Sequence, residues 1–306
     1  MPALLLRAFA KINLGLRILS SRPDGYHEIR TVYQAISLAD RLDVWVGPRA
    51  GAIEVEADDP SIPQGPTNLA YRASEAWRRV RKFDRAIRIS IQKSIPSGSG
   101  LGGASSDAAA ALVGLERLTG DKLPLAVRLQ LACELGSDVP FFLIGGRAFG
   151  CGRGEEVYDL PDLPRRHCLV VFPGFAQSTR AAYAEVDLEL TGSSRTRSIY
   201  SLGKWPQFPW KSWEAAENDF ESVVLAKWPE LLRLKRQLLR ADAEVASLTG
   251  SGTAVYAIFD SAQKLALAKR SVPPNWRAFA THTLSRAEYR NCTLGGRSLE
   301  RVGSHP

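Results

Sequence analysis

The sequence is poor in cysteine and histidine, and these few residues are not spaced as metal ligands. There are four of each in 306 residues. The cysteines, at positions 133, 151, 168 and 292, include no C-x-x-C pair, and no histidine stands near one at a ligand-like spacing. Such a pattern argues against a metal cluster and against a disulfide scaffold. We therefore expect reduced thiols in a cytosolic protein.

Long apolar runs are also missing. A membrane-spanning helix needs about 18 or more consecutive apolar residues, and the chain has no such run. The apolar stretch at residues 3–6 is too short for the core of a signal peptide and is soon followed by Arg7 and Lys11. The sequence therefore predicts a soluble, cytoplasmic protein without a membrane partner.

Runs of a single charge are short, although the net charge is +8. The basic clusters at residues 78–82, 165–166 and 233–236 are typical of solvated surfaces. The excess of positive charge is compatible with a nucleic acid or with a polyphosphate substrate, and it does not decide between them. The length and the 45% hydrophobic content suit one large domain or two ordinary ones.

Residues 96–107 form a stretch rich in glycine and serine. Its glycines are at 98, 100, 102 and 103. Because glycine has no Cβ, such a segment can curl until successive N–H groups point into one concavity, which binds anions. Ser105, Ser106 and Asp107 are candidate helix caps before an alanine-rich run that favours a helix. The sequence thus predicts a phosphate site at a helix N-terminus.

Other glycine-rich segments fit this stretch less well. A flexible linker seldom ends in a capped helix. The G-x-G-x-x-G pattern of dinucleotide-binding folds needs a second strand after the helix, but a second helical stretch follows here. A Walker A loop needs lysine where the chain has Ala104, and the V-A-I-K strand of protein kinases is absent.

The stretch resembles the P-x-x-x-G-L-G-x-x-S-S motif of the GHMP kinases, the superfamily of galactokinase, homoserine kinase, mevalonate kinase and phosphomevalonate kinase. Within it, G-L-G-G-A-S-S-D is similar to the 4-diphosphocytidyl-2-C-methyl-D-erythritol kinases, which usually have a third glycine where this chain has Ala104. The resemblance implies that the segment binds ATP through Pro96, Ser97, Gly98, Ser99, Gly100, Leu101, Gly102, Gly103, Ala104, Ser105 and Ser106.

A second motif lies near the N-terminus. Residues 8–18 alternate between apolar and other side chains, which predicts a strand with one buried face. Lys11 and Asn13 share the opposite face, where a lysine is usually solvated. The segment is similar to the first motif of the superfamily, and this similarity implies a catalytic Lys11 and a substrate-binding Asn13.

Aromatic residues mark a third site. The turn at residues 23–25 places Tyr26 and His27 at the start of the next strand. The run R-P-D-G-Y-H-E resembles one particular to the diphosphocytidyl kinases, which implies that both side chains bind the cytidine base. A tyrosine can stack on a pyrimidine and a histidine can bond its edge. The resemblance also places Thr179 and Tyr183 near the substrate, with Tyr183 as a second aromatic ring that stacks on the base.

Three further polar residues stand at the ends of predicted elements. Asn68 is either the cap of a helix over residues 68–80 or a nucleotide contact. Lys93 ends a strand just before the glycine-rich stretch, within reach of a bound phosphate. Asp138 lies in extended chain, because Pro140 disfavours helix at the residue before it. It could cap a short helix, but G-S-D-V-P-F-F-L matches the family segment that contains the catalytic base.

The overall pattern predicts an α+β protein of two domains, residues 1–160 and 161–306. Strands and helices mix in both halves, and Thr249 opens a second glycine turn that corresponds to the third superfamily motif. The resemblance implies the GHMP kinase fold, with an N-terminal ribosomal-protein-S5-domain-2-like domain and a C-terminal ferredoxin-like domain. We expect the tail after Arg290 to be poorly ordered.

The implied reaction moves the γ-phosphoryl group of ATP to the 2-hydroxyl of 4-diphosphocytidyl-2-C-methyl-D-erythritol, in the non-mevalonate route to isoprenoids. Asp138 would accept the hydroxyl proton, and Lys11 would keep that carboxylate ionised. Mg²⁺ should accompany ATP, with Ser106 and Asp107 as candidate ligands. We expect the partner to be a small cytidine diphosphate substrate and not a nucleic acid, and we expect the protein to be a monomer or a weak homodimer.

Two alternatives remain open at this point. A homoserine or mevalonate kinase would share the glycine-rich stretch and the fold, but Tyr26 and His27 disfavour it. A nucleic-acid-binding module is suggested by the net charge and by the tryptophan-rich segment at residues 204–213, which matches no motif of the family.

Overall fold

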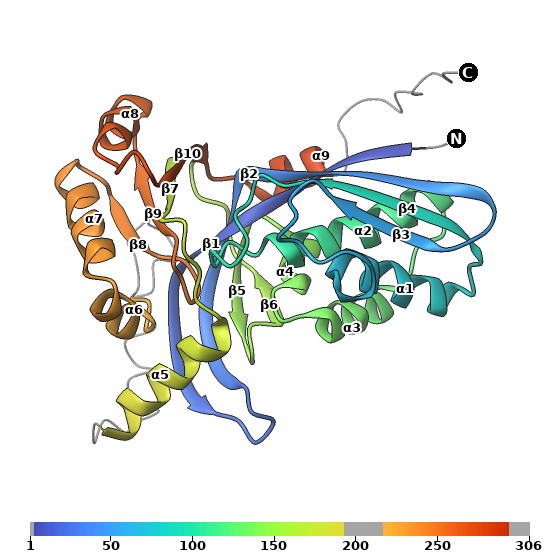
Figure 1. The fold of residues 1–306 in the computed structure, drawn as a ribbon, viewed down its shortest axis with the longest axis horizontal. Coiled ribbons are helices and arrows are strands. Elements are labelled where there is room, and N and C mark those ends of the chain that lie inside the picture. The colour runs from blue at the N-terminus through green and yellow to red at the C-terminus, as the bar shows by residue number, and fades with distance from the viewer. Residues whose placement is uncertain (1–2, 193–216, 294–306) are drawn as a thin grey trace.

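The computed structural model of the protein describes residues 3–192 and 217–293. The tryptophan-rich segment at 204–213 and the chain beyond residue 293 lie outside these residues. Two sheets, each covered by helices, form two units that are joined by the long strands β1 and β2 (Figure 1). The predicted mixture of helix and sheet is confirmed.

The first sheet contains the strands of the N-terminal half. They are β1 (Ala3–Ser21), β2 (His27–Ala50), β3 (Ile53–Ala57), β4 (Arg85–Gln92), β5 (Arg147–Cys151) and β6 (Glu156–Asp159). Their order is β3-β4-β2-β5-β6, and β1 pairs antiparallel with β2. The sequence predicts separate strands over residues 29–38 and 41–46, where β2 is continuous, and it predicts a turn-rich passage between residues 150 and 166, where β6 lies.

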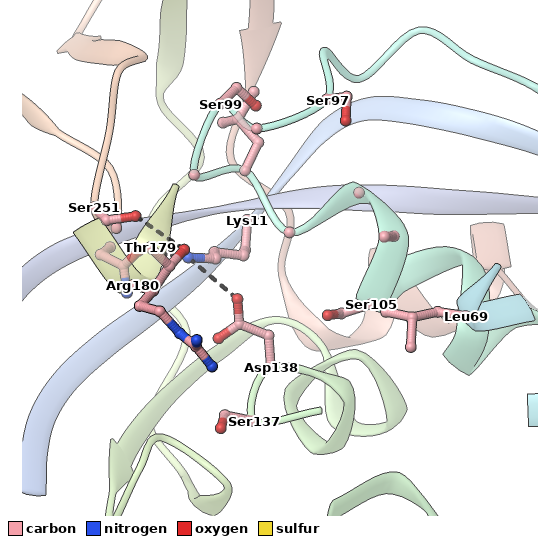
Figure 2. Close-up of a pocket in the computed structure, with 18 of the residues that line it drawn as sticks. Lys11, Leu69, Ser97, Ser99, Ser105, Ser137, Asp138, Thr179, Arg180 and Ser251 are labelled. Atoms are coloured by element: carbon pink, nitrogen blue, oxygen red, sulfur yellow. Dashed lines mark hydrogen bonds and ion pairs between the residues drawn. The ribbon is translucent and has the colours of Figure 1, made fainter. Parts of the chain in front are cut away.

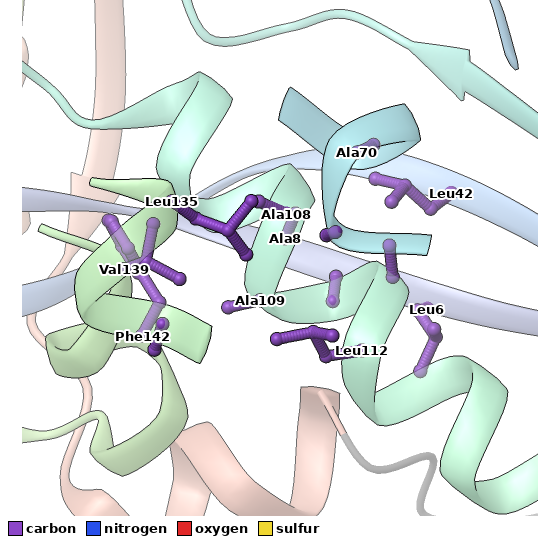
Figure 3. Close-up of a cluster of buried hydrophobic side chains, with 14 of the residues drawn as sticks. Leu6, Ala8, Leu42, Ala70, Ala108, Ala109, Leu112, Leu135, Val139 and Phe142 are labelled. Carbon is purple, nitrogen blue, oxygen red and sulfur yellow. The ribbon is translucent and has the colours of Figure 1, made fainter. Parts of the chain in front are cut away.

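Four helices cover one face of this sheet: α1 (Leu69–Arg81), α2 (Gly103–Thr119), α3 (Leu125–Leu135) and α4 (Val139–Ile144). The sequence predicts a helix over residues 125–135, and α3 has these bounds. α2 is rich in alanine and buried on most sides, so it can lie close to the strands. Ala109 and Leu112 of α2 share a core with Leu6 of β1 (Figure 3). At Gly114 a Cβ would lie only 2.7 Å from Leu6. This close packing holds α2 against the strands, and the glycine-rich stretch ends at the start of this helix.

The second sheet has the order β10-β7-β9-β8, and its pairs are antiparallel. Its strands are β7 (His167–Phe172), β8 (Val245–Leu248), β9 (Val255–Phe259) and β10 (Arg277–His282). Its helices are α5 (Thr179–Gly192), α6 (Glu221–Lys227), α7 (Pro229–Arg240) and α8 (Ala262–Arg270). The sheet order β10-β7-β9-β8, with α5, α6 and α7 between β7 and β8 and with α8 between β9 and β10, is the ferredoxin-like arrangement that the resemblance implies. The four-residue strand β8 is not predicted from the sequence.

A last helix, α9 (Arg286–Thr293), returns to the first unit. Tyr289 is buried there, and its hydroxyl donates a 2.7 Å hydrogen bond to the carbonyl oxygen of Phe142. The expectation of poor order directly after Arg290 is therefore wrong for residues 291–293, because burial of Tyr289 and Thr293 holds the helix in place.

The two sheets share part of one core. Ile12 and Leu14 of β1 are buried in the same cluster as Val170 of β7 and Tyr256 of β9. A domain boundary at residues 160–161 stays a prediction, although the chain passes from β6 to β7 near that point. Since β1 belongs to both cores, its polar residues are held at the junction of the two units.

The cysteines, the possible metal ligands and the helices of the described residues add three simple findings. All four cysteines are free, with Cys168 buried and Cys292 exposed. Within residues 3–192 and 217–293, no three side chains of histidine, cysteine, aspartate or glutamate are grouped to hold a metal ion. No helix in these two ranges is long and apolar enough to cross a membrane.

Candidate active site

A cleft of about 1150 Å³ lies at the junction of the two units. Residues from β1, from the turn before β2, from the glycine-rich stretch, from the start of α4 and from the start of α5 line it. The glycine turn after β8 contributes Gly250 and Ser251. Figure 2 shows Lys11 and Asp138 facing each other inside this cleft.

Lys11 lies on β1 and is only 3% exposed. The expectation of a strand with one buried face is wrong here, because the second sheet and the glycine-rich stretch cover the other face. The Lys11 ammonium donates a 2.7 Å hydrogen bond to Asn13 Oδ1. It also forms an ion pair with Asp138 Oδ2 at 3.5 Å. Irregularities of the β1–β2 pairing on both sides of Lys11 help to direct it into the cleft.

Asp138 immediately precedes α4 and has helical backbone angles, φ −85° and ψ −15°. The prediction of extended chain is wrong. Pro140 lies in the first turn of α4, where the missing N–H would have no helical partner in any case, so the helix can begin before it. The Asp138 side chain does not cap the helix. Its carboxylate is 29% exposed and faces the cleft.

Tyr33 of β2 binds Oδ1 of Asp138, the carboxylate oxygen that is not paired with Lys11. Its hydroxyl donates a 3.0 Å hydrogen bond to Asp138 Oδ1. Burial of Tyr33, together with the nearby Asp138 charge, raises its pKa well above the usual range, so the phenol remains a proton donor. Sequence reasoning misses Tyr33. The only signal is the strand register, which pairs it with Asn13.

Asn13 connects three parts of the site. Its side-chain amide donates to Thr31 Oγ1 at 2.7 Å, while its Oδ1 accepts from Lys11. Thr249 Oγ1 lies 3.3 Å from Asn13 Oδ1 and 3.2 Å from the carbonyl oxygen of Gly100. Both ends of the Asn13 side chain thus fix neighbouring residues, and its contact with the substrate stays a prediction.

The glycine-rich stretch curls in front of α2. Gly98, Gly100 and Gly102 all have positive φ, as the anion-binding loop predicted from the sequence requires. α2 begins at Gly103, with Gly102 before it. The prediction that Ser105, Ser106 and Asp107 cap this helix is therefore wrong, because they lie inside its first turns. We call residues 96–103 the phosphate loop from here on.

The phosphate loop is anchored on both sides. The backbone N–H of Lys11 donates to the carbonyl oxygen of Leu101 at 3.0 Å. At Gly100 a Cβ would lie 2.1 Å from the carbonyl oxygen of Thr249, so no larger residue fits between the loop and the second glycine turn. These contacts place the loop directly beside the Lys11–Asp138 pair.

Lys93 lies beneath the loop in a buried ionic cluster. Its ammonium contacts Asp40 at 2.5 Å and Asp107 at 2.8 Å. Burial would lower the pKa of Lys93, but the two carboxylates outweigh it and raise that pKa. Burial raises the pKa of Asp107 to about 7 against the pull of Lys93. Asp40 is fully buried and is not predicted from the sequence. Binding of ATP by Lys93 stays a prediction.

Asn68 caps α1, as one of the two sequence predictions states. Its Oδ1 accepts the N–H of Ala70 at 2.8 Å, and its side-chain amide donates to the carbonyl oxygen of Pro63 at 2.8 Å. Asn68 also lines the cleft, so a nucleotide contact stays a prediction.

The predicted base-binding residues gather at another part of the cleft. His27 and Tyr183 stack with their ring centroids 4.3 Å apart. Tyr26 is 51% exposed, and the guanidinium of Arg153 lies 4.7 Å from its ring centroid. Thr179 Oγ1 is 3.2 Å from Ser251 Oγ. The structure thus brings these four residues, together with Asn13, to the same cleft, and adds Arg153 as a cation that sequence reasoning misses.

Comparison with known families gives two matches. The family described as GHMP kinases N terminal domain matches residues 68–146. The family described as GHMP kinases C terminal matches residues 210–277. The first match includes the phosphate loop and Asp138, and the second includes the glycine turn after β8.

Individual relatives are similar over most of their length. The 4-diphosphocytidyl-2-C-methyl-D-erythritol kinase of Solibacter usitatus (strain Ellin6076) is 44% identical over 257 residues, which are 83% of this chain and 80% of the relative. A crystal structure of 4-(cytidine 5'-diphospho)-2C-methyl-D-erythritol kinase is 32% identical with a TM-score of 0.73, and covers 92% of this chain and 99% of its own. The homoserine kinase of Cytophaga hutchinsonii ATCC 33406 is similar in fold alone, at 18% identity and a TM-score of 0.67, over 93% of this chain and 95% of its own.

Proposed function

The chain belongs to the GHMP kinases and, within them, to the 4-diphosphocytidyl-2-C-methyl-D-erythritol kinases, and from this membership we propose that it transfers the γ-phosphoryl group of ATP to the 2-hydroxyl of 4-diphosphocytidyl-2-C-methyl-D-erythritol. The products are the 2-phosphate and ADP, in the non-mevalonate route to isoprenoid precursors. As a GHMP kinase the enzyme uses ATP as its phosphoryl donor.

One observation carries the proposal: the Lys11–Asp138 ion pair lies beside the phosphate loop. The pair is held at 3.5 Å, and the backbone of Lys11 is bonded to Leu101 of the loop. Phosphoryl transfer needs positioning and charge stabilisation more than covalent help from the protein. A loop that offers backbone N–H groups at a helix N-terminus, next to an ammonium and a carboxylate, supplies both.

The proposed step uses Asp138 as the proton acceptor. The oxygen of the substrate 2-hydroxyl forms a bond to the γ-phosphorus of ATP, the bond from that phosphorus to the β–γ bridging oxygen breaks, and the hydroxyl proton moves to Asp138. Lys11, whose ammonium lies 3.5 Å from Asp138, neutralises the charge on the transferring group. Tyr33, which donates to the other carboxylate oxygen, fixes the direction in which Asp138 accepts the proton.

We propose that Mg²⁺ binds near the start of α2, at Ser106 and Asp107. In the described residues, Ser106 Oγ and Asp107 Oδ1 are buried oxygens without a hydrogen-bond partner. Hard oxygen donors of this kind are the ligands that Mg²⁺ prefers, and the ion neutralises phosphate charge when it is bound with ATP. Ser106 and Asp107 are therefore the residues that we propose to hold it.

The proposed partner is a small molecule, and neither nucleic acid nor a membrane enters the proposal. The residues that we assign to the site come from a single chain, so a monomer or a weak homodimer suffices. We place the enzyme in the cytoplasm, as is usual for a biosynthetic kinase. The basic side chains inside the cleft, such as Lys93 and Arg153, are largely paired with carboxylates, which disfavours an RNA-binding surface.

The test is mass-spectrometric detection of phosphate transfer. Purified protein is incubated with ATP, Mg²⁺ and the diphosphocytidyl sugar alcohol, and in parallel with homoserine or mevalonate. We expect a product that is heavier by one phosphoryl group from the cytidine substrate only. Phosphorylation of homoserine or mevalonate instead would assign the protein to a sister activity, and salt-sensitive RNA binding without any phosphate transfer would contradict the kinase assignment.

A further inference from the structure

Arg180 is the second residue of α5 and lines the cleft. Figure 2 shows its side chain extending over the cleft toward Asp138 and Ser137. Within residues 3–192 and 217–293, no hydrogen bond or ion pair involves its guanidinium. The reaction as described above does not use it.

Local stability does not explain an arginine at this position. The N-terminal end of a helix carries partial positive charge, so a cation there is unfavourable. The first turn of α5 has no acidic residue that could compensate. A negatively charged ligand in the cleft would provide the missing partner.

The other cations that line the cleft have carboxylate partners. Lys11 is paired with Asp138, and Lys93 is held by Asp107 and a second carboxylate. Arg153 contacts Glu155 at 3.0 Å. In the described part of the chain, Arg180 is thus the cleft cation whose donors are uncommitted. A guanidinium has five N–H donors in a planar fork, which suits two oxygens of a phosphate group.

The backbone of Arg180 is fixed on both sides. Thr179 is bonded to Ser251 of the second glycine turn, and the N–H of Ala181 donates to Ser178 Oγ at 3.1 Å. Tyr183, one turn later, is stacked on His27. Arg180 therefore lies one turn before Tyr183, which is proposed for the base, and its side chain extends toward Asp138, which is proposed to face the reacting hydroxyl.

The substrate carries the base at one end, the diphosphate in the middle and the reacting sugar alcohol at the other end. Its diphosphate joins the cytidine to carbon 4 of the sugar alcohol, whose 2-hydroxyl reacts. When the base lies against Tyr183 and the hydroxyl lies at Asp138, the diphosphate must lie between them. We propose that Arg180 binds the diphosphate of the cytidine substrate and thereby sets its position in the cleft. This assignment rests on the proposed function.

Binding measurements separate the diphosphate from the base. Affinities of wild type and of Arg180→Gln are measured by calorimetry with cytidine 5'-diphosphate and with cytidine. A lost charge-assisted bond should weaken binding of the diphosphate about tenfold or more and leave cytidine unchanged. Arg270→Gln, which removes the same charge from exposed Arg270 on α8, is the matched control and should bind both like wild type.

Steady-state kinetics add an independent readout. Arg180→Gln should raise the KM for the cytidine substrate and leave the KM for ATP unchanged, and Arg180→Lys should recover part of the loss because it keeps the charge without the fork. An unchanged affinity of Arg180→Gln for cytidine diphosphate, or an equal loss for ATP, would overturn the assignment. If wild type fails to phosphorylate the cytidine substrate, the proposed function fails, whereas the two cytidine ligands still decide the role of Arg180.

Discussion

Tyr183 of α5 lies face to face on His27 of β2, with the ring centroids 4.3 Å apart and the planes 9° from parallel. The contact joins the two units across the cleft. Tyr183 also meets Phe220 edge-on at 4.9 Å, and its burial raises its pKa. The sequence analysis predicts that the ring of Tyr183 stacks on the cytidine base, yet His27 already covers one face of this ring. Its role therefore includes holding His27 in position.

This stacking predicts different results for two substitutions. Tyr183→Phe keeps the ring and should behave almost like wild type. Tyr183→Ala frees His27, and since a stacked pair contributes about 0.5–1.5 kcal/mol, the KM for the cytidine substrate should rise about 2- to 10-fold. Tyr26→Ala should give a similarly selective loss. Steady-state kinetics with each substrate varied checks this, and an equal rise in the KM for ATP would contradict a role at the base.

Asp138→Asn should separate chemistry from binding. The amide keeps the shape of the side chain but cannot accept the hydroxyl proton, so kcat should fall by about 10²- to 10⁴-fold, the usual size of a general-base contribution. The affinity for ATP, measured by calorimetry, should remain close to that of wild type. Asp159→Asn, which alters an exposed carboxylate on β6, is the control and should keep full turnover. Full activity of Asp138→Asn would remove Asp138 from the mechanism.

Motifs and local patterns predict much of this site. The three superfamily motifs are far apart in the chain, and the fold brings Lys11, the phosphate loop and Thr249 into direct contact. The sequence predicts helices over residues 125–135 and 262–270, and α3 and α8 have these bounds because their start and stop signals lie within the helix and its flanks.

Other parts depend on contacts between distant segments. Tyr33 contacts Asp138, and Asp40 contacts Lys93, only because of strand pairing and the packing of α2. Both residues look like ordinary strand residues in the sequence. The short strands β5, β6 and β8 have too few residues for a reliable alternating pattern. α9 is held by Tyr289, whose partner Phe142 lies 147 positions earlier in the chain. Local sequence carries no sign of such contacts.

Lys93→Met should destabilise the fold. The substitution leaves the carboxylates of Asp40 and Asp107 buried without their cation, and breaking a buried ion pair in this way costs about 3–5 kcal/mol. Urea unfolding should show the loss, and the added change Asp107→Asn should recover part of it by removing one charge. Lys264→Met, at exposed ion pairs on α8, should change stability little. If Lys93→Met raises the KM for ATP but unfolds like wild type, Lys93 acts mainly on the phosphates.

Gly100→Ala should uncouple the phosphate loop from the second glycine turn. Gly100 has φ +83°, and a Cβ there would lie 2.1 Å from the carbonyl oxygen of Thr249. Gly120, at the end of α2, has φ +73° and open space around it, so Gly120→Ala measures the backbone cost alone, about 1–2 kcal/mol. Gly100→Ala should lose more stability than this control and should also raise the KM for ATP. Equal unfolding free energies and an unchanged KM in the two variants would show that the contact between loop and turn is not needed.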